Sequence, residues 1–347
     1  MKNILIIRPS AIGDIVMASA MIPALKVRYP DSRLVWLADP SVASLLETHP
    51  QIDEILLWPK AVWREDFRKG RWLRLAASIL SLRKKLRAGN FDLAIDAVGL
   101  LRSRLLARLS GAGQRIGFVS REPGEFLMTR IVTRGGRIEL MSSEYRHLME
   151  ELGCDTRDFA PSLELASQDR RKAEALLHDQ AMGPFVAIAP FTTRPQKHWF
   201  EERWVELAER IWKQTGLRPL LLGGPGDVRA AGRIASRCKA PLVNLTGKCG
   251  LRQTAALVSL CDLLIGVDTG LTHMGTAFSR PTLALFGSTC PYLETPSPRT
   301  RVLYEPLPCS PCKRRPSCSG DFTCMASLSV DRVMAEVQAL LASGGRE

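Results

Sequence analysis

The sequence lacks any apolar run long enough to cross a bilayer. No window approaches the ~18–20 apolar residues that a membrane helix needs. Arg8 and Asp14 interrupt the apolar start before it reaches the length of a signal-peptide core. We therefore expect neither a membrane span nor a signal peptide, and we expect the protein in the cytoplasm. Short-period repeats are also absent, and the only small low-complexity stretch is the tail Ser343–Glu347.

A disulfide framework is not expected either, because the cytoplasm keeps thiols reduced and the sequence has only nine cysteines in 347 residues. Four of them follow the pattern C-x2-C-x5-C-x5-C, at Cys309, Cys312, Cys318 and Cys324. The first pair has the knuckle spacing of structural zinc sites, but the second pair does not. A structural metal and reduced structural thiols both remain open, the thiols being favoured, and neither interpretation makes the cluster catalytic.

The charge distribution is uneven. Lys and Arg total 48 against 35 for Asp and Glu, which gives a net charge of +13. Between Lys60 and Leu140 there are 18 basic and 7 acidic residues. An acidic membrane surface and nucleic acid both fit such a basic region, although a single run such as Arg83–Arg87 is as readily a solvated face. No aromatic-studded basic sheet or recognition-helix motif supports nucleic acid.

Short apolar runs alternate with helical patterns along the whole chain, which predicts an α/β fold of parallel strands with crossover helices. We predict two Rossmann-like doubly wound domains, at residues 1–160 and 161–328, followed by a closing helix and tail at 329–347 with Ser329 as the helix cap. The expected strands are 3–7, 33–38, 54–57, 93–96, 185–189, 218–222, 263–267 and 283–286. The expected helices are 15–28, 41–48, 71–88, 103–110, 201–215, 227–236, 251–259, 271–278 and 329–341. Ligands of such sheets bind at the carboxyl ends of the strands, so two domains predict a central cleft.

The loop after the first strand carries Asp14 at the expected start of a helix. Asp is a favoured helix cap, which is one interpretation of this residue. The loop has no G-x-G-x-x-G fingerprint, and a carboxylate would repel a pyrophosphate. A base directed at a hydroxyl is the other interpretation.

Two further loops suit an anionic ligand. APFTTRPQKHWFEERW, from Ala189 to Trp204, offers threonine hydroxyls, backbone amides and a lysine before a helix, which together can cradle a phosphate. An ordinary surface loop with Trp199 and Trp204 packed below it is the alternative. After the strand ending at Val267, a D-T-G turn opens a helix and forms a second anion nest, with His273 one turn further on.

Four segments together resemble one enzyme family: RPSAIGDIV, FDLAIDAVGLLRS, PFTTRPQKHW and GVDTGLTHMGTAFSRPTLALFGST. In this order and spacing they look like the bacterial ADP-heptose:lipopolysaccharide heptosyltransferases of glycosyltransferase family 9. The match runs over nearly the whole chain and is greatest to heptosyltransferase I. The resemblance implies a glycosyltransferase-B fold, with the acceptor on the N-terminal domain and the ADP-sugar on the C-terminal domain.

The resemblance also implies roles for individual residues. Asp14 would be the general base. Thr192, Thr193 and Lys197 would bind phosphate, and Asp268, Thr269, Gly270 and His273 would surround the heptose and diphosphate. Asp227, in the sequence GGPGD, is a candidate for the ribose hydroxyls, because the family's acidic residue is displaced by one position here. The acceptor's Kdo carboxylates and phosphates would meet Arg64, Arg68, Lys69 and Arg121.

The implied activity is inverting transfer of heptose from ADP-heptose to a hydroxyl of Kdo, or of an inner-core heptose, in lipopolysaccharide. It needs no cofactor and no catalytic metal. The acceptor, Kdo-lipid A or core oligosaccharide, is anionic, which accounts for the basic half and implies peripheral attachment to the inner face of the inner membrane. Two alternatives remain: a related transferase using another nucleotide sugar or a later core position, and a non-catalytic binder of sugar nucleotides.

Overall fold

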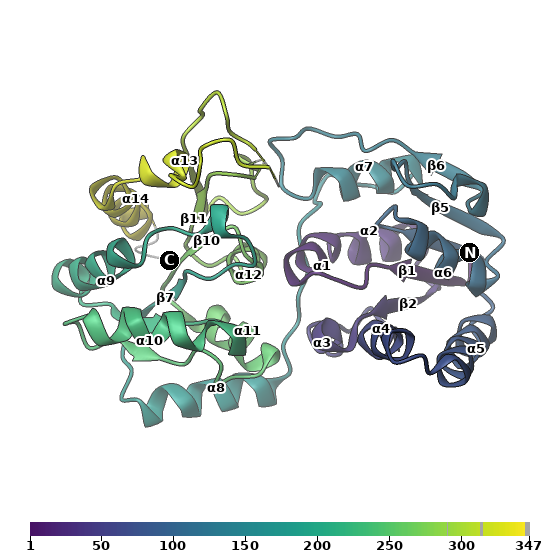
Figure 1. Ribbon diagram of the computed structural model, residues 1–347, viewed down its shortest axis with the longest axis horizontal. Coiled ribbons are helices and arrows are strands. Elements are labelled where there is room, and N and C mark those ends of the chain that lie inside the picture. The colour runs from purple at the N-terminus through teal and green to yellow at the C-terminus, as the bar shows by residue number, and fades with distance from the viewer. Residues whose placement is uncertain (290, 313–314, 344–347) are drawn as a thin grey trace. The chain divides into compact units, whose positions relative to one another are not determined.

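The computed structural model describes residues 1–289, 291–312 and 315–343, and the chain forms two compact units (Figure 1). Unit 1 comprises Met1–Arg137 and Ser142–Glu164, and unit 2 comprises Ile138–Met141 and Leu165–Glu347. The short segment 138–141 joins unit 2 through backbone hydrogen bonds to Glu294. The Glu294 carbonyl accepts from the Met141 amide at 2.9 Å, and the Glu294 amide donates to the Glu139 carbonyl at 2.8 Å.

Unit 1 is built on a six-stranded parallel sheet with the strand order β3-β2-β1-β4-β5-β6. Its central strands are continuous buried runs of Ile, Leu, Val and Ala, as expected for strands covered by helices on both faces. The strands are β1 Asn3–Ile7, β2 Arg33–Ala38, β3 Glu54–Leu57, β4 Leu93–Asp96, β5 Gln114–Phe118 and β6 Arg130–Val132.

The helices of unit 1 connect these strands, with α2 packed beside α7 and α5 beside α6. They are α1 Ile12–Ala18, α2 Met21–Arg28, α3 Pro40–Ala43, α4 Lys60–Arg68, α5 Trp72–Ala88, α6 Leu101–Ser110 and α7 Ser143–Glu151, with a 3-10 turn at Glu125–Leu127. The single helix predicted over 15–28 is wrong. Pro23 has no N–H to donate to the Ser19 carbonyl, which accepts from Ile22 instead, and the helix is interrupted there. The helix predicted over 41–48 is also too long, since α3 ends at Ala43.

Unit 2 repeats the same topology with the strand order β12-β11-β10-β7-β8-β9. The strands are β7 Phe185–Ala189, β8 Arg218–Leu221, β9 Val243–Asn244, β10 Leu263–Val267, β11 Thr282–Phe286 and β12 Thr300–Tyr304. The helices are α8 Ser167–Asp179, α9 Glu201–Thr215, α10 Val228–Arg237, α11 Leu251–Leu260, α12 Gly270–Ala277, α13 Thr323–Ala326 and α14 Val330–Ser343, with 3-10 turns at Pro195–Lys197 and Pro225–Asp227.

The closing helix α14 packs against α9, β11 and β12 and buries one apolar face in the core of unit 2. The Arg332 amide donates to the Ser329 hydroxyl at 3.2 Å, so Ser329 caps the helix as predicted. The tail residues 344–347 lie outside the described residues.

The predicted α/β class, with two doubly wound parallel sheets, is confirmed. In each sheet the chain leaves the two central strands, β1 and β4 or β7 and β10, in opposite directions, and ligands of open α/β sheets bind at such switch points. The backbone register aligns Ile7 with Asp96 and Ala189 with Gly266, so the loops after each central pair start side by side. Within the described residues, no helix has the length and apolar character needed to span a bilayer.

Two helical glycines provide a matched test of how tightly α12 packs on the sheet of unit 2. A methyl group at Gly275 of α12 would overlap Leu264 of β10 and Thr282 of β11, both fully buried, whereas a methyl group at Gly232 of α10 would meet nothing within 4 Å. Gly275→Ala should lower the free energy of unfolding by about 1–3 kcal/mol. Gly232→Ala should raise it by about 0.5–1 kcal/mol. Urea denaturation of both variants checks these opposite signs, and equal effects would contradict the packing of α12.

Candidate active site

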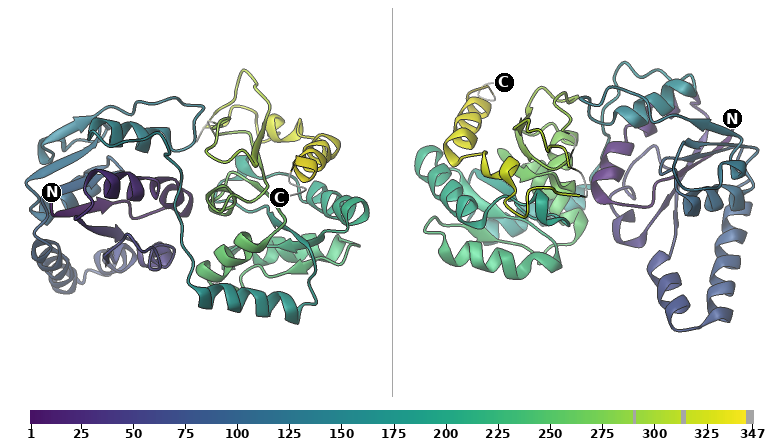
Figure 2. Two further views of the ribbon diagram at one scale, coloured as in Figure 1. Left: turned by 180° about the vertical axis from the view of Figure 1, so that it is seen from behind. Right: turned by 45° about the horizontal axis from the view of Figure 1, so that its top comes forward.

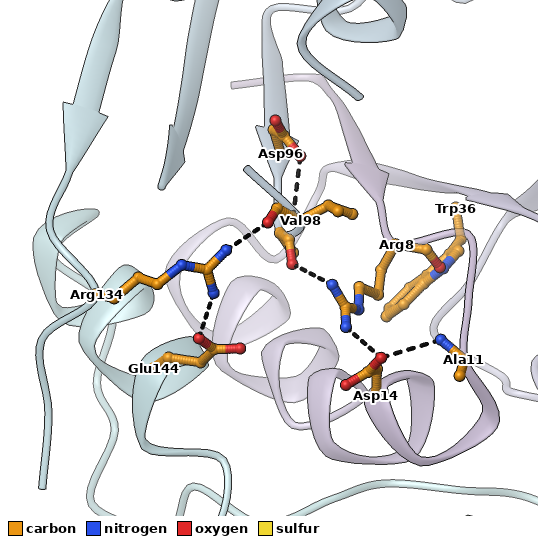
Figure 3. Close-up of polar contacts among 9 residues, drawn as sticks. Arg8, Ala11, Asp14, Trp36, Asp96, Val98, Arg134 and Glu144 are labelled. Atoms are coloured by element: carbon orange, nitrogen blue, oxygen red, sulfur yellow. Dashed lines mark hydrogen bonds and ion pairs between the residues drawn. The ribbon is translucent and has the colours of Figure 1, made fainter. Parts of the chain in front are cut away.

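The first cluster of polar side chains lies at the switch point of unit 1 (Figure 3). Arg8 follows β1 and Ala97 follows β4, so the register of the two strands brings them together. Arg8 Nη1 donates to the Ala97 carbonyl at 2.9 Å, and Arg8 Nη2 lies 2.5 Å from Asp14 Oδ2. The Arg8 carbonyl in turn accepts from the Trp36 indole at 3.0 Å. The guanidinium is buried, so its position is set by the sheet.

Asp14 is held through one carboxylate oxygen only. It is the third residue of α1, and its Oδ2 accepts from the Ala11 amide at 3.0 Å as well as from Arg8. Within the described part of the chain, Oδ1 has no hydrogen-bond partner, and the side chain is 38% exposed. The carboxylate therefore caps the helix, and it also presents a second oxygen that remains available to a ligand.

The groups around Arg8 come from other elements. The guanidinium lies over the Tyr145 ring of α7, 5.7 Å from its centroid. Glu144 of α7 binds Arg134 at 2.6 Å, and Arg134 also donates to the Val98 carbonyl. Among the described residues, Arg8 Nε and the Tyr145 hydroxyl are buried without a hydrogen-bond partner, and burial strongly raises the pKa of Tyr145. Buried polar atoms without a hydrogen-bond partner are rare in folded proteins.

Asp96 at the end of β4 organises the neighbouring loop. It is buried, and its Oδ1 accepts from the Val98 amide at 3.0 Å and the Gly99 amide at 3.1 Å. Its Oδ2 accepts from the Ser103 hydroxyl of α6 at 3.0 Å. Burial raises the pKa of this carboxyl despite these hydrogen bonds. Asp96 thus fixes the backbone that presents the Ala97 carbonyl to Arg8.

The second cluster lies at the switch point of unit 2 and centres on Asp268, which directly follows β10. Lys197 Nζ lies 2.5 Å from Asp268 Oδ2 and donates to the Asp268 carbonyl at 3.1 Å. The Thr289 hydroxyl donates to Oδ2 at 2.7 Å, and His273 Nε2 lies 3.4 Å from Oδ1. The carboxylate therefore joins the loops after β7, β10 and β11.

The charges of this cluster are strongly coupled. Burial alone would raise the pKa of Asp268, but His273 and Lys197 outweigh it and hold that pKa well below its usual range. His273 is buried, and its Nδ1 lies 2.5 Å from the Tyr292 hydroxyl. Burial, together with the Asp268 charge, raises the pKa of Tyr292. Tyr292 remains a neutral phenol that fixes the imidazole.

The other residues predicted for the donor lie around the same edge of the sheet. The Thr192 hydroxyl donates to the Asp268 carbonyl at 3.5 Å, and Thr193 is exposed. Thr269 precedes α12 and Gly270 begins it, and no described side chain caps this helix. Its first amides are therefore open to a ligand. Trp199 and Trp204 are buried below the loop, with ring centroids 5.0 Å apart.

Asp227 lies on the loop after β8, the strand beside β7, where its Oδ2 accepts from the Gly224 amide at 2.8 Å.

The predicted acceptor residues lie on two segments of unit 1. Arg64 and Arg68 belong to α4 with Lys69 directly after it, whereas Arg121 follows β5. All four are exposed, and Lys69 pairs with Glu65 at 2.5 Å. Strands β2, β1 and β4 separate β3 from β5, so the two groups follow strands on either side of the central pair β1 and β4.

The four clustered cysteines are free thiols, exposed at Cys309 and buried at Cys324. Among the described residues, which exclude 313 and 314 within this stretch, no three His, Cys, Asp or Glu side chains are grouped as metal ligands. Burial raises the pKa of the Cys312 and Cys324 thiols. The neighbouring thiols of the cluster raise these two pKa values further.

Sequence reasoning missed several members of the two clusters. Arg8 and Ala97 directly follow strands that were predicted, so their positions carried a signal that was not used. Thr289 and Tyr292 lie beyond β11 in an irregular loop, and Tyr145 lies on α7, which was not predicted. No sequence pattern placed these three residues beside the central strands.

The chain is similar to known proteins over most of its length. The family model for glycosyltransferase family 9 (heptosyltransferase) matches residues 79–322. Lipopolysaccharide heptosyltransferase 1 of Pseudomonas aeruginosa is 26% identical, over 98% of each chain. The chain belongs to glycosyltransferase family 9. It is a glycosyltransferase, as the resemblance implied.

Solved structures of this family share the fold. A family 9 glycosyl transferase from Veillonella parvula superposes with a TM-score of 0.85 at 21% identity, covering 99% of this chain and 98% of that one. The ADP-heptose lipopolysaccharide heptosyltransferase II of E. coli has a TM-score of 0.75 at 22% identity and covers 100% of both chains. The glycosyltransferase-B fold is therefore confirmed.

The coupled charges of unit 2 predict a pH-dependent stability. Asp268→Asn removes the carboxylate between Lys197 and His273 and should lower the free energy of unfolding by roughly 3 kcal/mol near neutral pH. Because the folded-state pKa of Asp268 lies below that of the unfolded chain, the carboxylate's contribution is complete above the unfolded value, ~3.9, and declines as pH falls below it. The difference between wild type and variant should shrink by about 1 kcal/mol from pH 5 to pH 3. Urea unfolding at both pH values measures it, and a difference that stays constant or grows would contradict the pairing.

Proposed function

We propose that this glycosyltransferase moves heptose from ADP-heptose to a hydroxyl group of the lipopolysaccharide inner core, with inversion at the anomeric carbon. Unit 1 would hold the acceptor and unit 2 the ADP-sugar. The observation that carries the proposal is the half-engaged carboxylate of Asp14, which Arg8 and Ala11 bind through Oδ2 while Oδ1 has no partner among the described residues. A general base needs this arrangement: a fixed orientation and a free oxygen within reach of the proton.

In the proposed reaction, Asp14 Oδ1 takes the proton of the acceptor hydroxyl as that oxygen forms its bond to the anomeric carbon. The bond between this carbon and the β-phosphate oxygen breaks, and the electron pair leaves with ADP. Because attack and departure occur on opposite faces of the sugar ring, the configuration inverts. Each transfer thus leaves one proton on Asp14, which passes to solvent through the exposed side of the carboxylate.

The departing diphosphate would be stabilised by fixed charges of unit 2. The Lys197 ammonium can exchange its ion pair with Asp268 for one with a phosphate. The first amides of α12 are open to the same anion. Asp268, held by His273 and Thr289, would then keep the lysine aligned or accept a hydrogen bond from a sugar hydroxyl. These groups neutralise the leaving group without requiring a metal ion or another cofactor.

A direct assay tests the acceptor position, because the relatives include both lipopolysaccharide heptosyltransferases 1 and 2. The purified protein is incubated with ADP-heptose and either Kdo-lipid A or the same acceptor already carrying one heptose. Mass spectrometry should show the gain of one heptosyl group on one of them, with Kdo-lipid A expected. UDP- and GDP-sugars serve as competing donors. No heptose transfer to either acceptor would refute the proposed function.

Replacing Asp14 by Asn should separate chemistry from binding. The Asn side chain can still accept from Arg8 and Ala11, but it cannot take a proton, so kcat should fall about 10²–10⁴-fold. The affinity for the ADP-sugar should stay close to that of the wild type. Steady-state kinetics and calorimetry measure the two quantities, with Asp155→Asn in the exposed pair with Arg157 as a matched control. Near-normal turnover of Asp14→Asn would exclude it as the base.

Replacing Lys197 by Ala should weaken the binding of the nucleotide itself. Losing a charge-assisted contact to the diphosphate should weaken binding of ADP about tenfold or more. Calorimetric titration with ADP measures this, with Lys213→Ala on the exposed face of α9 as the matched control. If both variants bind ADP like the wild type, Lys197 does not belong to a phosphate cradle.

A further inference from the structure

The helices α4 and α5 of unit 1 form a hairpin whose tip leaves large apolar side chains in solvent. Phe67 is 60% exposed, Trp72 58% and Leu73 90%, and the Phe67 and Trp72 rings meet edge to face with centroids 5.1 Å apart. Leu80, two turns along α5 on the face of Leu73, is 59% exposed. Clustered apolar exposure of this kind marks an interaction surface.

The base of the hairpin is anchored firmly in unit 1. Leu82 and Leu86 of α5 are buried in the core with Trp58. The Trp63 indole of α4 donates to the Ser78 hydroxyl of α5 at 2.7 Å, which ties the two helices together. In the right-hand view of Figure 2 the two helices, drawn in blue, extend away from the sheet of this unit. The apolar tip is thus held outward by its own base.

The same hairpin is strongly basic. Between Lys60 and Ala88 there are ten Lys and Arg residues and two acidic ones. Both acids are paired locally, because Glu65 binds Lys69 and the buried Asp66 lies 3.7 Å from Arg71 and 3.5 Å from Arg74. The remaining cations are Lys60, Arg64, Arg68, Arg83, Lys84, Lys85 and Arg87.

Exposed aromatic and aliphatic side chains on helices rich in Lys and Arg are typical of helices that lie in the interface of an anionic bilayer. The charge argues against the other occupants of an exposed apolar face. A second copy of the same hairpin would bring two strongly positive surfaces together, and nucleic acid would leave Leu73 and Leu80 without an apolar partner.

We infer that the α4–α5 hairpin, residues 60–88, is the surface on which this protein docks to an anionic membrane. Phe67, Trp72, Leu73 and Leu80 enter the interface, and the surrounding cations meet lipid phosphates. The inference rests on the proposed function in one respect: an acceptor held in a membrane leaflet gives this protein its reason to bind a membrane. Membrane binding itself needs neither donor nor acceptor, so it can be tested separately from transfer.

The test is co-sedimentation of the full chain with vesicles of phosphatidylcholine, alone or mixed with phosphatidylglycerol. The wild type should bind the anionic vesicles, and binding should weaken as salt rises from about 0.05 to about 0.5 M. The double variant Leu73→Glu with Leu80→Glu should bind at least tenfold more weakly. The variant Leu73→Trp should bind the anionic vesicles more tightly than the wild type does, a gain that loss of the native fold does not explain. The matched control Val27→Glu, at a 71% exposed apolar side chain of α2, should bind like the wild type.

Two readouts separate this inference from the proposed function. Turnover with a soluble, deacylated acceptor should be unchanged in the double variant, and gel filtration should show the same size for both proteins. Failure of the wild type to bind anionic vesicles would overturn the inference, as would equal binding by the double variant. A change in oligomeric size without any change in vesicle binding would overturn it in favour of self-association.

Discussion

The divergence of the chain from the two central strands of each sheet is the constraint on which both candidate sites depend. Where β1 and β4 end, and again where β7 and β10 end, the following segments run to opposite sides and leave the strand ends open. The register places Ile7 beside Asp96 and Ala189 beside Gly266, so polar residues just beyond the strands meet although they are far apart in sequence. The sheets are hydrophobic scaffolds, and the candidate functional residues lie just beyond the carboxyl ends of their central strands.

Each candidate site contains an ion pair, which under the proposed function a substrate would divide. In unit 1 the buried Arg8 engages one oxygen of Asp14 and leaves the other available. In unit 2 Asp268 holds Lys197 in place, with His273 and Thr289 as supports. Such pairing compensates the charges, and under the proposed function it would orient them for a hydroxyl or a phosphate. Asp96, buried with a raised pKa, contributes by ordering the loop that anchors Arg8.

The central strands were predictable from sequence because buried parallel strands are continuous apolar runs, as NILII and LLIGV illustrate. The edge strands β6, β9 and β12, and β5 beside β6, were missed because they are short or mix polar and apolar residues. Asp14 and Lys197 could be proposed because they lie in the segments that follow such runs, after Ile7 and Ala189. Asp268, the partner of Lys197, was predicted as well. The Arg8–Ala97 contact was not, because it depends on strand order although both residues follow predicted strands, and Tyr145 and Tyr292 approach from segments without a sequence pattern.

The central claim is that the free oxygen of Asp14 receives the acceptor's proton. The most direct measurement is a crystal structure of the wild-type protein with the acceptor and a non-transferable ADP-sugar. We expect the reacting hydroxyl oxygen at about 2.6–3.2 Å from Asp14 Oδ1, with Arg8 still on Oδ2. A reacting hydroxyl bound by another side chain, with Asp14 out of reach of the sugar, would contradict the account.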